Sequence, residues 1–219
     1  MFKMVDRMGR YMNIILLGQI TSGKGTLAEG LREEFGFELV SIGALLREET
    51  KKDTPEAKTI AEYQEKGNLV PEEIVIAVLK KHMANAASKN LLFDGYPRNL
   101  QQAKTLDSIT DIDAVLVLDV ENSIVRHRFM GRRGCKKCGH ITHVDFIGDK
   151  QVCPVCGGEL EIRNDMTEEA MINKMKSFET ETKPLIDYYS NWGIIHHLDA
   201  GHSPEHTLEQ AVEVLKGLK

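Results

Sequence analysis

A glycine-rich turn is the most chemically distinctive segment of this sequence. After an apolar run at residues 14–17 the chain reads GQITSGKGT, which begins at Gly18 and contains Lys24, and a helical pattern, LAEGLREEF, follows. Glycines allow backbone N–H groups to turn inward around phosphate oxygens, a helix N-terminus attracts anions, and a lysine adds a mobile cation. This order of strand, loop, lysine and helix predicts a cradle for the phosphates of a nucleoside triphosphate.

A metal ion bound to those phosphates needs an anchor outside the loop. Gly25 follows the lysine, at the place where a serine or threonine usually ligates Mg²⁺. Asp94 is the candidate, because it ends an apolar run at residues 91–93 and ligands of open α/β sheets bind at the carboxyl ends of the strands. A carboxylate there can hold Mg²⁺ directly or through its water shell. The alternative is an aspartate that only caps a loop or a helix.

Four cysteines form a second group with chemical potential, in two C-x2-C pairs that are 14 residues apart. They are Cys135, Cys138, Cys153 and Cys156. Two such pairs are typical of a closed tetrahedral zinc site, which is structural because it leaves no position for a catalytic water. Disulfides and free thiols are the alternatives. His140 and His143 could replace a thiolate, but four cysteines already satisfy the ion, and ordinary hairpin roles are the simpler interpretation.

Two arginines lie four residues apart in the helical pattern SIVRHRFMGRR. Because residues i and i+4 share one face of a helix, Arg128 and Arg132 are expected to converge, and such like charges repel unless an anion lies between them. The alternative is a solvated basic face at a helix C-terminus, where cations are favoured in any case. The pattern therefore favours a second set of phosphate-binding cations.

The elements that must position these residues follow from hydrophobic periodicity. Short apolar runs separated by helical stretches predict a parallel sheet with helices on both faces. The runs are residues 14–17, 37–40, 91–93, 115–118 and 194–198. Thr54 and Ser203, each followed by proline, are typical of helix starts, and Gly36 and Gly67 of helix ends. Residues 134–160 break the pattern and indicate an insert, in which ITHVDF is expected to be a strand of a hairpin turning at residues 148–149.

Composition limits the classes of function. The chain has 219 residues, 42% of them hydrophobic, which suits one α/β domain with a small insert. A net charge of −5 provides no general basic field, so binding of nucleic acid is disfavoured. No run approaches the ~18 apolar residues of a membrane span, and the N-terminal segment lacks the apolar core of a signal peptide. A soluble, cytoplasmic protein that does not bind membranes is expected.

Taken together, these segments resemble the adenylate kinase family in its long-lid, zinc-containing form. The resemblance runs from about residue 13 to the C-terminus and rests on motifs in the family's order and spacing: GQITSGKGT, VSIGALLR, GNLV, DGYPRNLQQ, FMGRRGCKKCG, VCPVCGGEL, IRND and KPLIDYY. It implies an α/β fold of the P-loop nucleoside monophosphate kinase type, in which helices flank a five-stranded parallel sheet. It also implies a monomer that transfers a phosphoryl group reversibly from ATP to AMP, giving two ADP, with Mg²⁺.

The same resemblance implies how the chain is divided and which residues act. Residues 1–12 would be an extension, residues 13–41, 71–132 and 164–219 the core, residues 42–70 a helical monophosphate-binding insert, and residues 133–163 a lid that holds structural Zn²⁺. Catalysis would depend on Lys24, Asp94, Arg98, Arg128, Arg132, Arg163 and Lys174. ATP would contact Gly18, Thr21, Ser22, Gly23, Lys24, Gly25, Thr26, Arg128, Arg132, Ile141 and Thr142. AMP would contact Ile42, Arg47, Asn68, Leu69, Val70, Gly95, Tyr96, Pro97, Arg98, Gln102, Arg163 and Lys174.

The sequence departs from the family pattern at several of these positions. Ile20 and Thr21 replace a usual proline and glycine of the phosphate loop. Ile42 stands where a threonine usually touches the adenine of AMP, and Ala44 where an aspartate is usual. Lys174 replaces an arginine and cannot make its bidentate contact with phosphate. Two rivals are left open: a kinase that prefers another monophosphate, and a nucleotide switch or zinc-ribbon adaptor without kinase activity.

Overall fold

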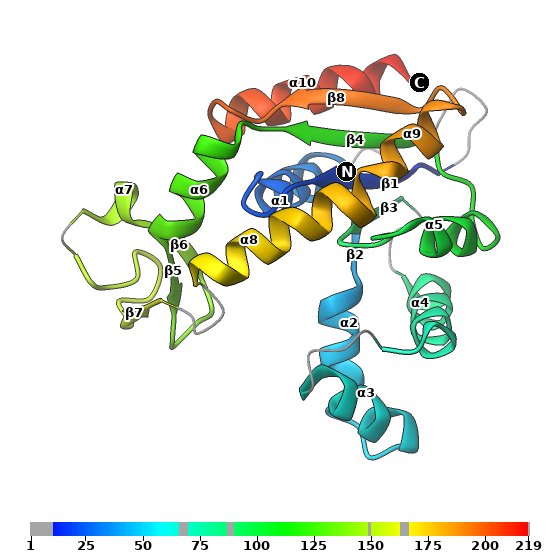
Figure 1. Cartoon of the computed structure of the whole chain (residues 1–219), viewed down its shortest axis with the longest axis horizontal. Helices are drawn as coiled ribbons and strands as arrows, with labels where there is room; N and C mark the ends of the chain where they lie inside the picture. The colour runs from blue at the N-terminus through cyan, green and yellow to red at the C-terminus, as the bar shows by residue number, and fades with distance from the viewer. Residues whose placement is uncertain (1–10, 66–69, 87–89, 149, 163–166, 219) are drawn as a thin grey trace.

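A five-stranded parallel sheet forms the centre of the fold, in the order β2-β3-β1-β4-β8 (Figure 1). This computed structural model describes residues 11–65, 70–86, 90–148, 150–162 and 167–218. The strands are β1 (Asn13–Gly18), β2 (Glu38–Ser41), β3 (Leu91–Asp94), β4 (Ala114–Asp119) and β8 (Ile195–Asp199). Each predicted apolar run therefore supplies a strand, and the predicted fold class is confirmed.

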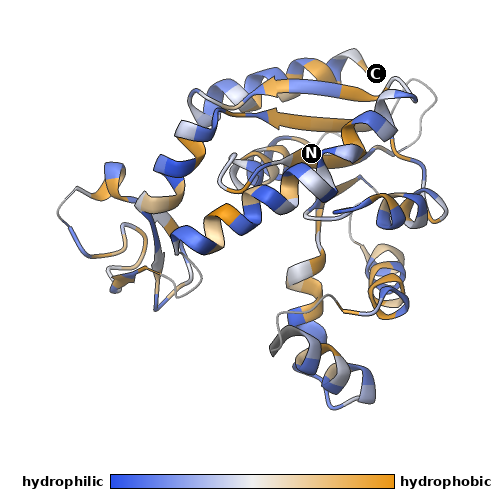
Figure 2. Ribbon diagram, in the orientation of Figure 1, coloured by the Kyte–Doolittle hydropathy of each residue, from blue (hydrophilic) through white to orange (hydrophobic). Residues whose placement is uncertain are grey.

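Side chains alternate along β1 and divide the core between the two faces of the sheet. Ile14 and Leu16 pack with residues of α1 (Lys24–Phe35) and α10 (Pro204–Gly217). Ile15 and Leu17 pack on the other face, with residues of α4 (Glu72–Asn85), α5 (Leu100–Asp107) and α9 (Pro184–Ser190). Strands buried on both faces are continuously apolar, which Figure 2 shows most clearly for β4.

Two excursions leave this core in different directions (Figure 1). The first consists of α2 (Ile42–Glu49) and α3 (Pro55–Glu65), between β2 and α4. The second begins with α6 (Asn122–Gly131) and carries a small antiparallel sheet of β5 (Arg132–Cys135), β6 (Ile141–His143) and β7 (Leu160–Glu161), with α7 (Val144–Ile147) after β6. The chain returns to the core through α8 (Glu168–Ser177) and the π-helix η1 (Phe178–Thr182).

The sequence signals for helix ends are confirmed where they lie in described residues. Thr54 Oγ1 accepts a hydrogen bond from Ala57 N (3.1 Å) at the start of α3, and Ser203 Oγ accepts one from His206 N (3.3 Å) at the start of α10. Gly36 ends α1 with a φ of 71°, in the left-handed region that favours glycine. Gly67 lies outside the described residues.

The predicted hairpin is wrong in its second half. The strand ends at His143, and residues 144–147 form α7, whose first turn is capped by a hydrogen bond from Asp145 N to His143 Nδ1 (3.2 Å). Partners for β6 come from β5 instead, where Gly134 pairs with Ile141. The alternating pattern of ITHVDF indicated one long strand, but this local cap and the pairing with β5 decide the structure.

The longest described helices, α4 and α10, have 14 residues each. Among the residues that the structure describes, no helix combines the length and apolar character that a membrane crossing requires.

Candidate active site

The glycine-rich loop joins the carboxyl end of β1 to the start of α1, as predicted. Gly18 lies so close to its neighbours that a Cβ atom would come within 2.7 Å of Ser22 Oγ. Gly23 has a φ of 101° immediately before the helix, again a conformation suited to glycine. The first N–H groups of α1 have no partner within the helix and, with the helix dipole, favour an anion. The loop therefore ends at a position suited to phosphate oxygens.

Thr21 holds this loop in a conformation that its residue type disfavours. Its φ is 52°, in the left-handed region, where a β-branched residue costs on the order of 1–3 kcal/mol. Its Oγ1 donates a hydrogen bond to the carbonyl oxygen of Val125 in α6, 3.0 Å away. The threonine that replaces the family's glycine thus ties the loop to α6. The sequence carries no signal for this contact, because the two residues lie far apart along the chain.

Lys24 points its ammonium group back into the loop. Nζ donates hydrogen bonds to the carbonyl oxygens of Gly18 and Gln19, both at 2.7 Å, and lies 3.5 Å from Ser22 Oγ. Burial lowers the pKa of Lys24 from 10.5 to about 8. The negative charge of Asp94 raises this pKa in part, and the positive charge of Arg98 lowers it further. The lysine is therefore a buried cation surrounded by oxygen acceptors. Oxygens of a bound phosphate could take the place of these acceptors.

Asp94 and Arg98 lie at the adjacent strand end, as expected for a site at the carboxyl edge of the sheet. Asp94 ends β3 and is in register with Leu16 of β1. Arg98 Nε donates to the carbonyl oxygen of Gly95 (2.9 Å), and Arg98 N donates to Gln102 Oε1 (2.8 Å). Gln102 was predicted to contact the adenine of AMP, and here its carbonyl oxygen fixes the backbone of Arg98. That positioning contact was missed by sequence reasoning, although the spacing of four residues permits it.

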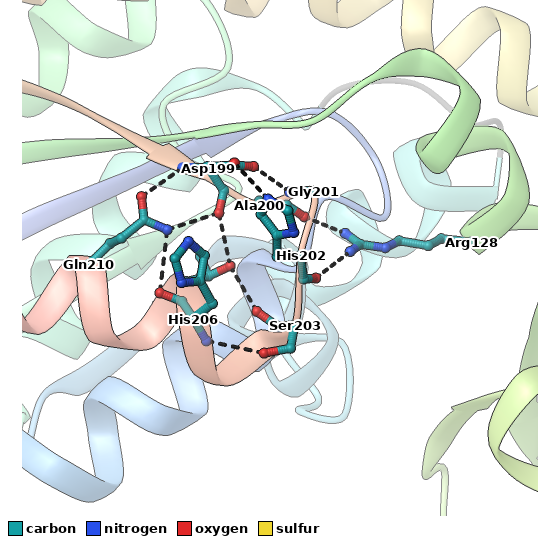
Figure 3. A network of polar contacts seen from close by, with 9 residues as sticks. Arg128, Asp199, Ala200, Gly201, His202, Ser203, His206 and Gln210 are labelled. Atoms are coloured by element: carbon teal, nitrogen blue, oxygen red, sulfur yellow. Dashed lines mark hydrogen bonds and ion pairs between the residues drawn. The ribbon is translucent and has the colours of Figure 1, made fainter.

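Arg128 binds the loop between β8 and α10 (Figure 3). Its guanidinium donates from Nη1 to the carbonyl oxygen of Ala200 (2.9 Å) and from Nη2 to that of His202 (3.0 Å). Burial lowers the pKa of Arg128. The guanidinium of Arg128 thus lies at the carboxyl end of β8 and binds backbone atoms of the core. Since Arg128 belongs to α6, this contact joins the core to the helix that leads to the small sheet.

The expectation that Arg128 and Arg132 share one helical face is wrong. Helix α6 ends at Gly131, and Arg132 has extended backbone angles, φ −67° and ψ 138°, and begins β5. A Cβ atom on Gly131 would lie 1.9 Å from Nε2 of His143, so the helix ends where this ring crosses it. Pairing of Arg132 with His143 in the small sheet then replaces the next helical turn.

The remaining predicted residues lie in the core, in the two excursions or outside the described residues. The side chains of Ile42 and Tyr96 are buried in the apolar cluster of α4, α5 and α9, so they are core residues. Arg47 lies in the last turn of α2, and half-buried Val70 packs against the same cluster. Ile141 and Thr142 lie on β6. Asn68, Leu69 and Arg163 lie outside the described residues.

Lys174 lies on α8 and approaches α6. Its Nζ is 5.8 Å from the centroid of the Phe129 ring, a distance at which a cation is attracted to an aromatic face. A second contact joins the same helices, an ion pair between Arg126 and Glu168 at 2.7 Å. In this conformation Lys174 therefore helps to hold α8 against α6.

The four cysteines converge at the small sheet. Cys135 Sγ lies 3.5 Å from Cys156 Sγ, Cys138 Sγ lies 3.7 Å from Cys153 Sγ, and all four sulfurs lie within 4.8 Å of one another. Tetrahedral zinc with Zn–S bonds of about 2.3 Å sets its sulfurs roughly 3.8 Å apart. Disulfide sulfurs would be about 2.0 Å apart. The cluster therefore fits the predicted structural zinc site.

The two halves of this cluster repeat one backbone motif. Cys135 O accepts from Gly139 N, and Cys153 O accepts from Gly157 N, both at 2.9 Å. Both glycines have a positive φ, 73° and 68°. In the first loop, the backbone N–H groups of Cys138 and Lys137 lower the pKa of Cys135, while the pKa of Cys138 beside it is raised, so Cys135 is the thiol of this loop that most readily becomes a thiolate.

Comparison with known proteins agrees with this geometry. A family model described as adenylate kinase matches residues 16–194. The chain is 40% identical over 215 residues to an adenylate kinase of Caldicellulosiruptor bescii, an alignment covering 94% of this chain and 99% of the relative. It is 38% identical to an adenylate kinase of Methanothrix thermoacetophila, over 93% of this chain and 98% of the relative. Because the adenylate kinase model matches most of the chain and these relatives align with it along nearly their whole length, the chain belongs to the adenylate kinase family.

Proposed function

We propose that this chain catalyses the Mg²⁺-dependent, reversible transfer of a phosphoryl group from ATP to AMP, giving two ADP. Adenylate kinase is the name that its relatives carry. The observation that carries the proposal is the buried ammonium group of Lys24 in the loop after β1, where both Asp94 and Arg98 alter its pKa. A cation, a carboxylate and a guanidinium at one sheet edge are the groups that two phosphorylated substrates and a divalent ion require.

The cations provide most of the catalysis in this proposal. Charge spreads over the phosphate oxygens in the transition state, so positioning and positive charge contribute more than a general base. Lys24 exchanges the carbonyl oxygens of the loop for oxygens of the β- and γ-phosphates of ATP. Arg98 and Arg47 hold the phosphate of AMP, and the backbone at residues 68–70, with that at Gly95 and Pro97, surrounds the nucleoside. Asp94 would hold Mg²⁺ directly or through water, and the ion would supply positive charge against the phosphates.

Two excursions move in this proposal. Residues 42–70 form the monophosphate-binding insert, residues 133–163 the lid, and residues 13–41, 71–132 and 164–219 the core. Closure of the lid brings Arg132, Arg163 and Lys174 over the phosphates and excludes water, which would otherwise hydrolyse ATP. Ile141 and Thr142 of β6 reach the adenosine of ATP at the same time. Since Arg128 binds the loop after β8, it forms the fixed side of this nucleotide site.

Partners and location follow from composition and cysteine chemistry. A net charge of −5 provides no general attraction for nucleic acid or anionic membranes. We therefore propose small nucleotides, bound by locally placed cations, as the partners. The sulfur separations of 3.5 and 3.7 Å between the two C-x2-C pairs fit thiols around a metal and not disulfides, which supports a reducing compartment, and we propose the cytoplasm. We also propose a monomer, because both nucleotide sites are assembled from one chain.

A kinase that prefers another monophosphate is the second candidate. It is favoured by Ile42, which is buried and apolar and therefore offers the base no polar side-chain contact. We expect AMP to be the best acceptor, since the backbone of Arg98 and the side chain of Gln102 are already held together at 2.8 Å beside the proposed base site. A coupled assay with ATP and Mg²⁺ against AMP, CMP, UMP and GMP measures this. A higher kcat/KM for CMP or UMP would identify the second candidate, and ATP turnover without any acceptor would contradict both.

Lys24→Met should lower kcat for ADP formation by at least ~100-fold, because it removes the cation nearest to the developing phosphate charge. The matched control is Lys216→Met, which removes an exposed lysine of α10 and should keep kcat within about twofold. Initial rates with saturating ATP and AMP provide the measurement. Equal rates in Lys24→Met and the control would refute the role of the loop.

ATP binding should take up protons at pH 8. With its pKa lowered to about 8, Lys24 is about half protonated there, and a polyphosphate beside it raises that pKa again, so roughly half a proton is taken up. Uptake should grow toward pH 9, where the free lysine is mostly neutral, and shrink toward pH 7. Calorimetry in two buffers with different ionisation enthalpies measures the uptake. Lys24→Met should abolish it, and identical binding enthalpies for the wild type in both buffers would exclude this assignment.

We also propose that the four cysteines bind one structural zinc ion. We expect Cys153→Ser to affect thermal stability, measured as the melting temperature, more strongly than it affects activity, measured as kcat at 25 °C. The buried cluster of the lid consists of Cys135, Cys153 and Leu160, so the metal replaces a core that the lid does not otherwise have. Val155→Ser is the matched control, since Val155 lies in the same loop and is 67% exposed. Elemental analysis and melting curves provide the readout. A zinc-free wild type, or equal melting of both variants, would overturn the assignment.

A further inference from the structure

We propose that His127, His143 and Asp145 form a second metal site, for a divalent transition metal ion of the zinc class, at the joint between α6 and the small sheet. Each residue comes from a different element: α6, β6 and α7. One ligand atom from each lies within 4.8 Å of the other two. Among the described residues, only this group and the four cysteines bring three or more such ligand atoms so close together.

The distances are close to those around a bound ion. Asp145 Oδ2 lies 3.2 Å from His143 Nδ1 and 3.7 Å from His127 Nε2. Nitrogen and oxygen ligands about 2.0–2.2 Å from zinc stand roughly 3.3 Å apart in a tetrahedron. His127 and Asp145 are exposed, with side chains 62% and 54% accessible, so both can turn toward His143.

Hydrogen bonds fix the tautomer of His143. Nε2 lies 3.2 Å from the carbonyl oxygen of His127, which can only accept, so Nε2 carries the proton and donates. Nδ1 is therefore the unprotonated nitrogen: it accepts from Asp145 N (3.2 Å) and lies 3.2 Å from Asp145 Oδ2, so an ion at Nδ1 would take the place of this N–H contact. A histidine that donates one ring nitrogen to a backbone carbonyl and keeps the other unprotonated is in the usual setting of a metal ligand. Two acceptors that face each other repel unless a cation lies between them.

The position of the ring is built into the fold. His143 is only 12% exposed, and its Nε2 lies 1.9 Å from where a Cβ atom on Gly131 would be, so the ring fits only because that residue is glycine. One ligand is therefore rigid and two are accessible, which allows an ion to enter from solvent. Two imidazoles and one carboxylate suit zinc and its neighbours in the first transition row, and they are a poor set for Mg²⁺ or Ca²⁺.

Calorimetric titration of Zn²⁺ into the full chain tests the proposal, after elemental analysis has measured the zinc already bound. At pH 7.5 the wild type should bind one further equivalent. His127→Gln and Asp145→Asn should each weaken this step by at least ~10-fold, because each removes one ligand. Melting curves verify that both exposed substitutions leave the fold intact.

His197→Ala is the matched control. His197 is also exposed and its Nδ1 lies 2.7 Å from Asp119 Oδ2, but no third ligand atom joins this pair in the described part of the chain. This variant should bind the further equivalent with unchanged affinity. No further zinc in the wild type would overturn the proposal and leave the group as a proton-bridged ion pair. A further equivalent that persists unchanged in both His127→Gln and Asp145→Asn would overturn it as well.

Discussion

The burial of the Lys24 ammonium group is the interaction on which the phosphate loop depends. A cation removed from water needs oxygen acceptors around it, and the carbonyl groups of Gly18 and Gln19 provide them at 2.7 Å. They can do so only because the chain turns sharply after β1, where Gly18 approaches Ser22 too closely to carry a side chain. The loop is therefore closed around its own lysine, and a ligand must offer better acceptors than the backbone does.

Helix α6 connects this loop to the rest of the site. It receives a hydrogen bond from Thr21 of the phosphate loop, and through Arg128 it binds the loop after β8. On α8, Lys174 approaches the Phe129 ring. At its end, the carbonyl of His127 accepts from His143 of the small sheet. Helix α6 therefore joins the phosphate loop, the loop after β8 and the small sheet through direct hydrogen bonds.

The sequence predicted the parts of the structure that depend on local patterns. Strands, capping residues and the cysteine cluster follow from runs of apolar residues, from hydroxyls before proline and from C-x2-C spacing, and each of these signals lies within a short window. It did not predict α7, because the cap that begins this helix is an imidazole, a side chain that capping rules do not include. Nor did it predict the end of α6 at Gly131, which depends on the ring of His143, twelve residues further along.

Within the candidate site the division is similar. Lys24 and Asp94 were predicted at one site because the carboxyl ends of parallel strands lie at one edge, whereas Arg98 was placed there through the family resemblance. The contacts of Thr21, Arg128 and Gln102 are specific to side-chain conformation and could not be derived from spacing. Ile42 was predicted at the base of AMP through the family resemblance, but its apolar side chain joins the core, where burial is more favourable.

The contact between Gly131 and His143 has a consequence for how this chain can vary through evolution. Any residue with a Cβ atom at position 131 would overlap the imidazole where it now lies, so that change requires the His143 ring to turn away or to be replaced. A smaller residue at 143 leaves glycine at 131 in place. Substitutions at the two positions are therefore coupled, and a larger residue at 131 disturbs the structure least where position 143 carries no ring.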